Sequence, residues 1–154
     1  MRREVADQIL ELIDAYDLHA NLPVKLTALE DRFPVRYGST RRRWRADGML
    51  IHPRDRPITA ANPAAVILDR NLNDHRERLT YAHEIGHALC GHLGAFTYQG
   101  MDPWFRRRQE LEAWEAGAAL LIPWHVWFGD LESAAQLCHV PRWLVRMVSQ
   151  SEVH

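Results

Sequence analysis

The chain has 154 residues, of which 47% are hydrophobic and 25% are charged, and its formal net charge is -1. This balance suits one globular domain with a proper core, and it gives no general attraction to nucleic acid or to anionic membranes. Cys90 and Cys138 are the only cysteines, too few for a disulfide framework, which favours a reducing compartment. Residues 1–7 lack the apolar stretch of a signal peptide and no apolar run is long enough to span a bilayer, so we expect a cytoplasmic protein without membrane contact.

The first half of the chain predicts two helices followed by short strands. Apolar residues recur at helical spacing over residues 3–19, and a second short helix is expected to start near Pro23 and to stop before Pro34. Beyond it, residues 64–68 are the clearest strand because they are continuous and apolar. Weaker strands are expected at 35–37, 44–52 and 57–59. Together these segments predict a small sheet.

A basic run with one tryptophan, residues 41–45, has two interpretations. Arginine beside tryptophan can grip a nucleic acid backbone and stack on bases. The alternative is a solvated hairpin tip, where charge keeps an edge strand from aggregating. We favour the hairpin tip because no second basic tract lines up with this run.

The strongest signal in the chain is the segment His-Glu-Ile-Gly-His, an H-E-x-x-H pattern. Residues four apart share a helix face, so His83 and His87 can aim their imidazoles at one point and form half of a tetrahedral zinc site. Glu84 directly follows the first histidine, where its carboxylate can act as general base on a metal-activated water.

The helix that would carry this motif has its own boundary signals. Asn73 or Asp74 can cap its beginning, and Gly91 can end it. The alternative is a core helix that happens to carry two histidines. A buried helix rarely gathers two imidazoles and a carboxylate without a purpose, so we favour the metal site.

A catalytic zinc site needs a third protein ligand and one open position. His92 does not complete the metzincin pattern, because that pattern needs glycine and histidine where this chain has Cys90 and Leu93. The other candidates lie on a long helix expected from about residue 104 to 121: Glu110, Glu112 and Glu115. Each of them could instead be a surface glutamate.

Residues 130–150 are expected to form two short helices separated by residues 139–141, in the manner of a helix-turn-helix. The second helix offers only Arg142 and Arg146 as basic residues for reading DNA. Small amphipathic helices of this kind usually cover a core, so we regard DNA contact by this tail as the weaker interpretation.

Two blocks of the chain resemble the ImmA/IrrE family of zinc metallopeptidases. Residues 79–87 are similar to that family's F-T-x-A-H-E-[LI]-G-H block, and residues 110–123 are similar to its E-x-x-A-N-x-F-A-x-x-L-L-[MI]-P block. Alignment on the final proline of the second block puts the family's ligand glutamate on Glu110. Glu112 remains the alternative ligand if the helix has a different phase.

The chain departs from the family pattern at two places. Trp114 stands where the family usually has Asn or Asp, which can steady a histidine ligand, and Ala116 and Gly117 replace a Phe-Ala pair. We expect metal binding to survive, since the proposed ligands are intact. Catalysis is less secure, because loss of such a supporting group can weaken affinity or activity by about 10–100-fold.

The resemblance implies an α+β fold, a zincin-like single domain over residues 1–154. It would contain a small, mostly antiparallel sheet, the H-E-x-x-H helix, a second ligand-bearing helix and the short helical tail at 130–150. The resemblance also implies a zinc-dependent endopeptidase, in which His83, His87 and Glu110 bind Zn2+ and Glu84 is the catalytic base. The implied substrate is a protein, a helix-turn-helix transcriptional repressor of a prophage, mobile element or stress response.

Two other functions remain open at this stage. One is a zincin-like binding module that keeps the metal but hydrolyses little, and the other is a DNA-binding regulator that uses the tail and the basic run. Oxyanion donors are also unassigned, with four candidates and a loop at 93–103 that could border the cleft: Tyr81, Tyr98, His92 and His125. Most of the tryptophans are expected to fill the core, although some could line a recognition groove: Trp104, Trp114, Trp124, Trp127 and Trp143.

Overall fold

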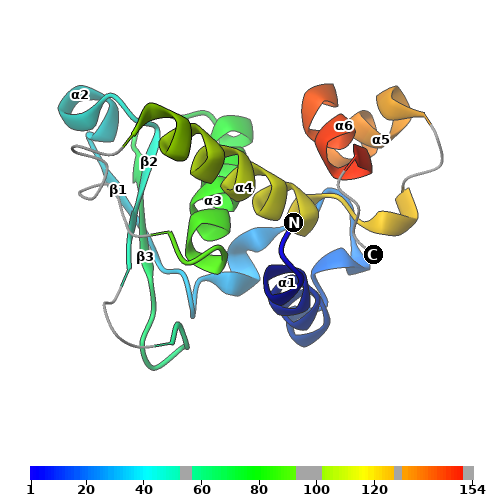
Figure 1. The fold of residues 1–154 in the computed structure, drawn as a ribbon, viewed down its shortest axis with the longest axis horizontal. Helices are drawn as coiled ribbons and strands as arrows, with labels where there is room; N and C mark the ends of the chain where they lie inside the picture. Colours follow the sequence, from blue (N-terminus) through cyan, green and yellow to red (C-terminus); the bar gives the residue numbers. More distant parts are fainter. Residues whose placement is uncertain (53–56, 93–101, 127–129, 151–154) are drawn as a thin grey trace.

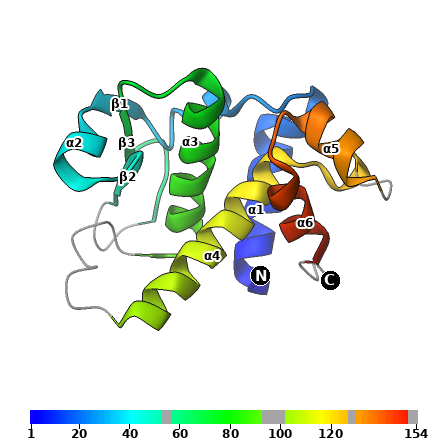
Figure 2. The same ribbon diagram turned by 90° about the horizontal axis from the view of Figure 1, so that it is seen from above.

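The computed structural model describes residues 1–52, 57–92, 102–126 and 130–150. A small sheet lies at one end of the molecule, the helical C-terminal tail lies at the other, and two long helices cross between them (Figure 1, Figure 2). The named elements are α1 (Arg3–Tyr16), three short 3-10 segments (Leu18–Ala20, Leu26–Leu29, Trp124–Val126), β1 (Val35–Gly38), α2 (Thr40–Trp44), β2 (Gly48–Ile51), β3 (Ala65–Asp69), α3 (Asp74–Leu89), α4 (Pro103–Leu121), α5 (Leu131–Cys138) and α6 (Arg142–Gln150). The α+β class is confirmed. Within the described ranges, no helix combines the length and the apolarity that a membrane span requires.

The sheet is built around β3, the apolar strand that the sequence predicted most clearly. The strand order is β1-β3-β2, and Val66 of β3, the central strand, is fully buried. Val35 of β1 pairs with Val66 in parallel, whereas Leu50 of β2 pairs with the same residue in antiparallel fashion. The sheet is therefore mixed, and the mostly antiparallel arrangement that we expected holds for one of its two strand pairs. β2 lies at an outer edge of this sheet, next to α3.

The basic run differs from the hairpin tip that we expected. Residues 40–44 form the short helix α2, and the strand predicted from residue 44 begins only at Gly48. The side chain of Asp69, at the end of β3, accepts a hydrogen bond from the backbone N–H of Arg41 at 2.8 Å and so satisfies a free donor in the first turn of α2. Arg45 ends the helix in a left-handed conformation with φ 56°. The weak strand predicted at 57–59 is reduced to an isolated bridge.

The beginnings of the two long helices follow from local side chains. Asn73 caps α3 by accepting a hydrogen bond from the backbone N–H of Arg76 at 2.9 Å. Asp102 caps α4 in the same way, accepting from the backbone N–H of Trp104 at 2.8 Å. Pro103 occupies the first turn of α4, where its missing N–H costs nothing. Both helices are thus set by capping residues that the sequence carries directly before them.

The two long helices touch backbone to backbone at a pair of glycines. A Cβ atom added to Gly86 of α3 would lie 2.0 Å from the carbonyl oxygen of Ala113, and one added to Gly117 of α4 would lie 2.5 Å from that of Ala82. No side chain larger than hydrogen fits at either position. This close crossing requires glycine at both positions, and it brings the middle of α4 over the histidine-bearing face of α3.

The C-terminal tail is part of the same core. Leu144 and Val145 of α6 are fully buried in the hydrophobic cluster that also holds the apolar residues of α1 and α3. The guanidinium group of Arg78 on α3 donates hydrogen bonds to the carbonyl oxygens of Cys138 and His139, at 2.9 and 3.0 Å, and so ties the turn between α5 and α6 to the centre of the molecule. The predicted pair of tail helices is confirmed, and they pack against the rest of the fold.

The glycine crossing predicts a large penalty for Gly117→Ala. The added methyl group meets backbone atoms of α3, which cannot rotate away as a side chain can, so we expect a loss of more than about 3 kcal/mol in the free energy of unfolding. Urea denaturation followed by circular dichroism measures it. Gly91→Ala is the matched control, because Gly91 has a positive φ of 70° but open space around its Cβ position, and it should cost only about 1–2 kcal/mol. Equal losses in the two variants would contradict the close crossing.

Candidate metal centre

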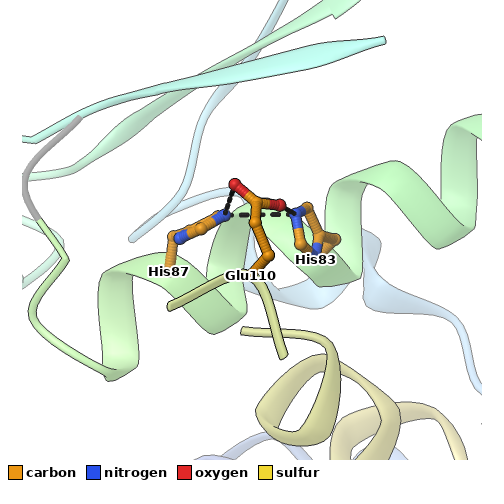
Figure 3. A group of neighbouring side chains, drawn as sticks. All are labelled: His83, His87 and Glu110. Atoms are coloured by element: carbon orange, nitrogen blue, oxygen red, sulfur yellow. Dashed lines mark hydrogen bonds and ion pairs between the residues drawn. The ribbon is translucent and has the colours of Figure 1, made fainter. Parts of the chain in front are cut away.

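Three polar side chains converge where α4 crosses α3 (Figure 3). The Nε2 atoms of His83 and His87 are 3.1 Å apart, so the two imidazoles share one face of α3 as their spacing predicted. The side chain of Glu110 extends from α4 toward them, with one carboxylate oxygen 3.2 Å from Nε2 of His83 and the other 3.8 Å from Nε2 of His87. Both histidines are buried.

This donor set can hold a metal ion. One ligand atom from each of His83, His87 and Glu110 lies within 4.8 Å of the others. Atoms that bind one tetrahedral ion at about 2.1 Å lie roughly 3.4 Å from each other, close to the separations of 3.1 and 3.2 Å. Two imidazole nitrogens and one carboxylate leave a fourth position open, as in catalytic sites. The residues present therefore fit a small divalent cation.

The electrostatic environment favours the protonation states that a metal needs. Burial is the main cause that lowers the pKa of His83. Burial would raise the pKa of Glu110, but hydrogen bonds and charge interactions with His83 and His87 together hold it well below its usual value. Near neutral pH the site thus presents a neutral imidazole from His83 and an ionised carboxylate, which are ligand forms.

Glu84 lies beside this triad and faces β2. It is buried, and this burial raises its pKa to about 7 despite a hydrogen bond from the backbone N–H of Leu50. Gly48 makes room for it, since a Cβ there would lie 3.1 Å from a carboxylate oxygen of Glu84 and 2.6 Å from the methyl group of Thr80. A carboxylate that titrates near neutrality can take and return a proton, and a cation at the neighbouring imidazoles would lower this pKa again.

A cleft of ≈ 930 Å³ leads to the triad from solvent. Its walls come from the α2–β2 segment, one face of α3 together with its cap, α4 and the tail: Trp44, Arg45, Ala46, Asp47, Gly48, Met49, Leu50, Asn73, His75, Arg76, Leu79, Thr80, His83, Glu84, His87, Arg106, Glu110, Trp114, Pro141 and Trp143. Sequence reasoning did not place Trp44 or Arg106 at the site, and it expected Trp143 to fill the core or to line a groove, because nothing in their local pattern reports long-range contacts. We expected the loop at 93–103 to border the cleft, and residues 93–101 of it lie outside the described residues.

Trp114 supports His83 by ring contact. Its ring lies 4.2 Å from that of His83, centroid to centroid, at an angle of 32°, and the ring of Trp143 from α6 meets Trp114 edge-on at 5.1 Å. The other ring nitrogen of His83, Nδ1, is buried and has no hydrogen-bond partner among the described residues. The family's usual polar group is thus replaced by an aromatic wall.

The expectation that most tryptophans fill the core is wrong for three of the described ones. Trp104, Trp124 and Trp143 are 67%, 80% and 48% exposed. Trp104 sits in the first turn of α4 and Trp124 begins a 3-10 segment, so both lie where an element starts and few neighbours surround them. Trp114 is partly buried, and Trp127 lies outside the described residues.

None of the three described oxyanion candidates lines the cleft. The hydroxyl group of Tyr81 donates a buried hydrogen bond to the carbonyl oxygen of Phe33 at 2.7 Å, so it supports the core. His92 lies behind His87, and His125 is exposed in the 3-10 segment after α4. Tyr98 lies outside the described residues.

The alternative third ligand points elsewhere. A carboxylate oxygen of Glu112 lies 3.2 Å from Nε2 of His92, and its other oxygen accepts a hydrogen bond from Arg108 at 3.0 Å. Two residues further along a helix the side chain direction has turned by about 200°, to nearly the opposite face. Glu110 is therefore the glutamate of this helix that faces both motif histidines.

Comparison with known proteins gives one match. The IrrE N-terminal-like domain matches residues 37–126, more than half of the chain, and this span runs from β1 to the segment after α4 and includes the triad and Glu84. No curated protein and no solved structure matches the chain. The matched span contains both sequence blocks that resembled the ImmA/IrrE family. The chain therefore belongs to the family of the IrrE N-terminal-like domain, the ImmA/IrrE metallopeptidases.

Proposed function

We propose that this protein is a zinc-dependent endopeptidase. The observation that carries the proposal is the convergence of His83, His87 and Glu110 at the bottom of one cleft, with the buried carboxylate of Glu84 beside them. Two histidines and a glutamate form the donor set of thermolysin-like zinc sites, and family membership supports peptide hydrolysis as the reaction.

The residues divide the chemistry among them. His83, His87 and Glu110 would hold the ion, which when bound supplies Lewis acidity that activates water near neutral pH. Glu84 accepts the proton of the attacking water and then delivers it to the leaving amine nitrogen. Burial raises the pKa of Glu84 to about 7, which suits a carboxylate that takes up and releases a proton. Gly48 and Leu50 keep its carboxylate at the edge of the cleft.

The substrate that we propose is a helix-turn-helix transcriptional repressor. Its cleavage would derepress the genes of a prophage, mobile element or stress response, as family membership suggests. The cleft runs beside the outer strand β2, so an extended peptide can pair with that strand while its side chains meet Trp44 and Trp143. Action in the cytoplasm agrees with two cysteines that are both free.

A zincin-like binding module is the second candidate. Nδ1 of His83, which has no hydrogen-bond partner in the part of the chain that the structure describes, favours it, because a histidine ligand without a supporting hydrogen bond is less basic and less firmly oriented. The third candidate, a DNA-binding regulator, has less support. Both Leu144 and Val145 of the would-be reading helix are committed to the core.

Metal content tests the ligand set. Wild type supplied with zinc at neutral pH should hold about one ion per chain, because three ligands fill one tetrahedral site with an open position. Glu110→Ala should lose the ion, whereas Glu112→Ala should retain it under the same supply. Elemental analysis of the gel-filtered proteins makes the comparison. Retention in Glu110→Ala with loss in Glu112→Ala would reassign the third ligand, and a wild type without metal would make the zinc proposal untenable.

Glu84→Gln tests the reaction itself. The amide keeps the shape of the side chain but cannot accept a proton, so cleavage should fall by about 10²–10⁴-fold while zinc content stays unchanged. Loss of full-length repressor on a gel, after coexpression with candidate repressors, measures the cleavage. Glu77→Gln on the same helix, outside the cleft, should cleave as wild type does. If derepression persists in Glu84→Gln without cleavage, the binding module replaces the peptidase.

A further inference from the structure

A second group of polar side chains lies directly behind His87. It comprises the side chains of Cys90, His92 and Glu112, whose ligand atoms lie within 4.8 Å of one another. His92 is buried although it follows the end of α3, and none of these three residues lines the catalytic cleft. The group therefore needs an explanation of its own, either as a second metal site or as a support for the first.

The backbone builds this group through the way in which α3 ends. Gly91 has a φ of 70° and its N–H donates to the carbonyl oxygen of Ala88 at 3.1 Å, while the N–H of His92 donates to that of His87 at 2.9 Å. This pair of hydrogen bonds is the Schellman motif, which favours glycine at the left-handed position. The chain thus folds back at Gly91 and lays the His92 ring against the last turn of the helix.

The hydrogen bonds of the group form a continuous line that starts at the proposed ligand. Nδ1 of His87 lies 2.9 Å from Nδ1 of His92, and Nε2 of His92 lies 3.2 Å from a carboxylate oxygen of Glu112. The other oxygen of Glu112 accepts from Nε of Arg108 at 3.0 Å. The line therefore ends on a permanent positive charge at the surface.

The protons along this line have only one consistent arrangement when His87 binds a metal. Nε2 of His87 faces His83 and Glu110, so it must offer its lone pair and the proton must lie on Nδ1. Nδ1 of His92 then has to accept that proton's hydrogen bond, which leaves the proton of neutral His92 on Nε2. From there it donates to the carboxylate of Glu112.

A second metal ion in this group conflicts with that arrangement. An ion on Nε2 of His92 would displace its remaining proton while Nδ1 still has to accept from His87, so the ring would have to become an anion. The Cys90 thiol is a poor ligand here, because burial raises its pKa to about 11 and keeps it protonated. The guanidinium group of Arg2, which donates to the carbonyl oxygen of Cys90, adds a positive charge beside it.

We propose that His92, backed by Glu112, is the positioning residue that fixes the tautomer and the orientation of His87. The proposal rests on the proposed function, since it assumes a metal at the triad. Hydrogen-bonded partners of this kind orient histidine ligands and raise their basicity. In this chain the partner is a histidine that connects His87 to a carboxylate, whereas Nδ1 of His83 has no such partner among the described residues.

Zinc affinity of the full chain tests the proposal, measured by competition with a chromogenic chelator. His92→Ala should bind zinc about 10–100-fold more weakly than wild type, since it removes the acceptor for Nδ1 of His87. His92→Gln should recover most of the affinity, because its amide oxygen can accept from His87 while its NH2 group donates to Glu112. Glu112→Gln, which preserves shape but removes the charge, should show a smaller loss. His125→Ala, exposed in the 3-10 segment after α4 and outside the cleft, is the control and should bind as wild type does.

The outcomes separate this proposal from the proposed function. Unchanged affinity in His92→Ala, with one zinc per wild-type chain, would overturn the positioning role and leave the peptidase intact. Two zinc ions per wild-type chain, with one lost in Cys90→Ser, would overturn it in favour of a second metal site. A wild type that binds no zinc would remove both. Urea denaturation of the metal-free proteins checks that His92→Ala still folds, and equal weakening in His92→Gln and His92→Ala would also count against the relay.

Discussion

The close crossing of α3 and α4 is the constraint on which the site depends. Glu110 reaches both motif histidines only because Gly86 and Gly117 let the two backbones touch. A Cβ atom added to Gly86 or Gly117 would lie 2.0 or 2.5 Å, respectively, from a carbonyl oxygen of the opposite helix. A wider crossing would carry the carboxylate away from His83 by the same amount. Metal ligands tolerate errors of only a few tenths of an ångström. The glycines, which carry no functional group, therefore decide whether three separate side chains can act as one site.

Polar side chains are also buried around this crossing, between α3 and α4 and between α3 and β2. His83, Glu84, His87 and His92 are each less than a tenth exposed, although buried imidazoles and carboxylates are costly without partners. His87 and His92 resolve this cost with a line of hydrogen bonds to the surface. Nδ1 of His83 has no hydrogen-bond partner among the described residues, and burial raises the pKa of Glu84. Such an arrangement is unfavourable for stability alone, and a cation at the triad would compensate for much of it.

How much the sequence predicted depends on the range of the interactions involved. The placement of His83 and His87 on one helix face was predicted correctly, and of the two predicted capping candidates Asn73 caps α3, because spacing and capping act within one or two helical turns. Glu110 was found through the resemblance, since helix periodicity alone left three glutamates open. The site's other walls, such as Trp143, come from tertiary contacts over long stretches of chain, which leave no periodic signal. The beginning of α2 also depends on a long-range contact, because Asp69 at the end of β3 accepts a hydrogen bond from the backbone N–H of Arg41.

The two motif histidines lie on the same face of α3, but different interactions hold their rings. His87 has a directional partner, a hydrogen bond to His92 of 2.9 Å, which fixes both the proton and the ring. His83 has the flat face of Trp114, itself fixed by Trp143 from the tail, and such contacts orient a ring without choosing its tautomer. The tail lies beyond the span that matches the family, yet through Trp143 it contacts the ring that packs on the proposed metal ligand His83. The departure at position 114 therefore exchanges a polar support inside the family domain for an apolar one that depends on the packing of α6.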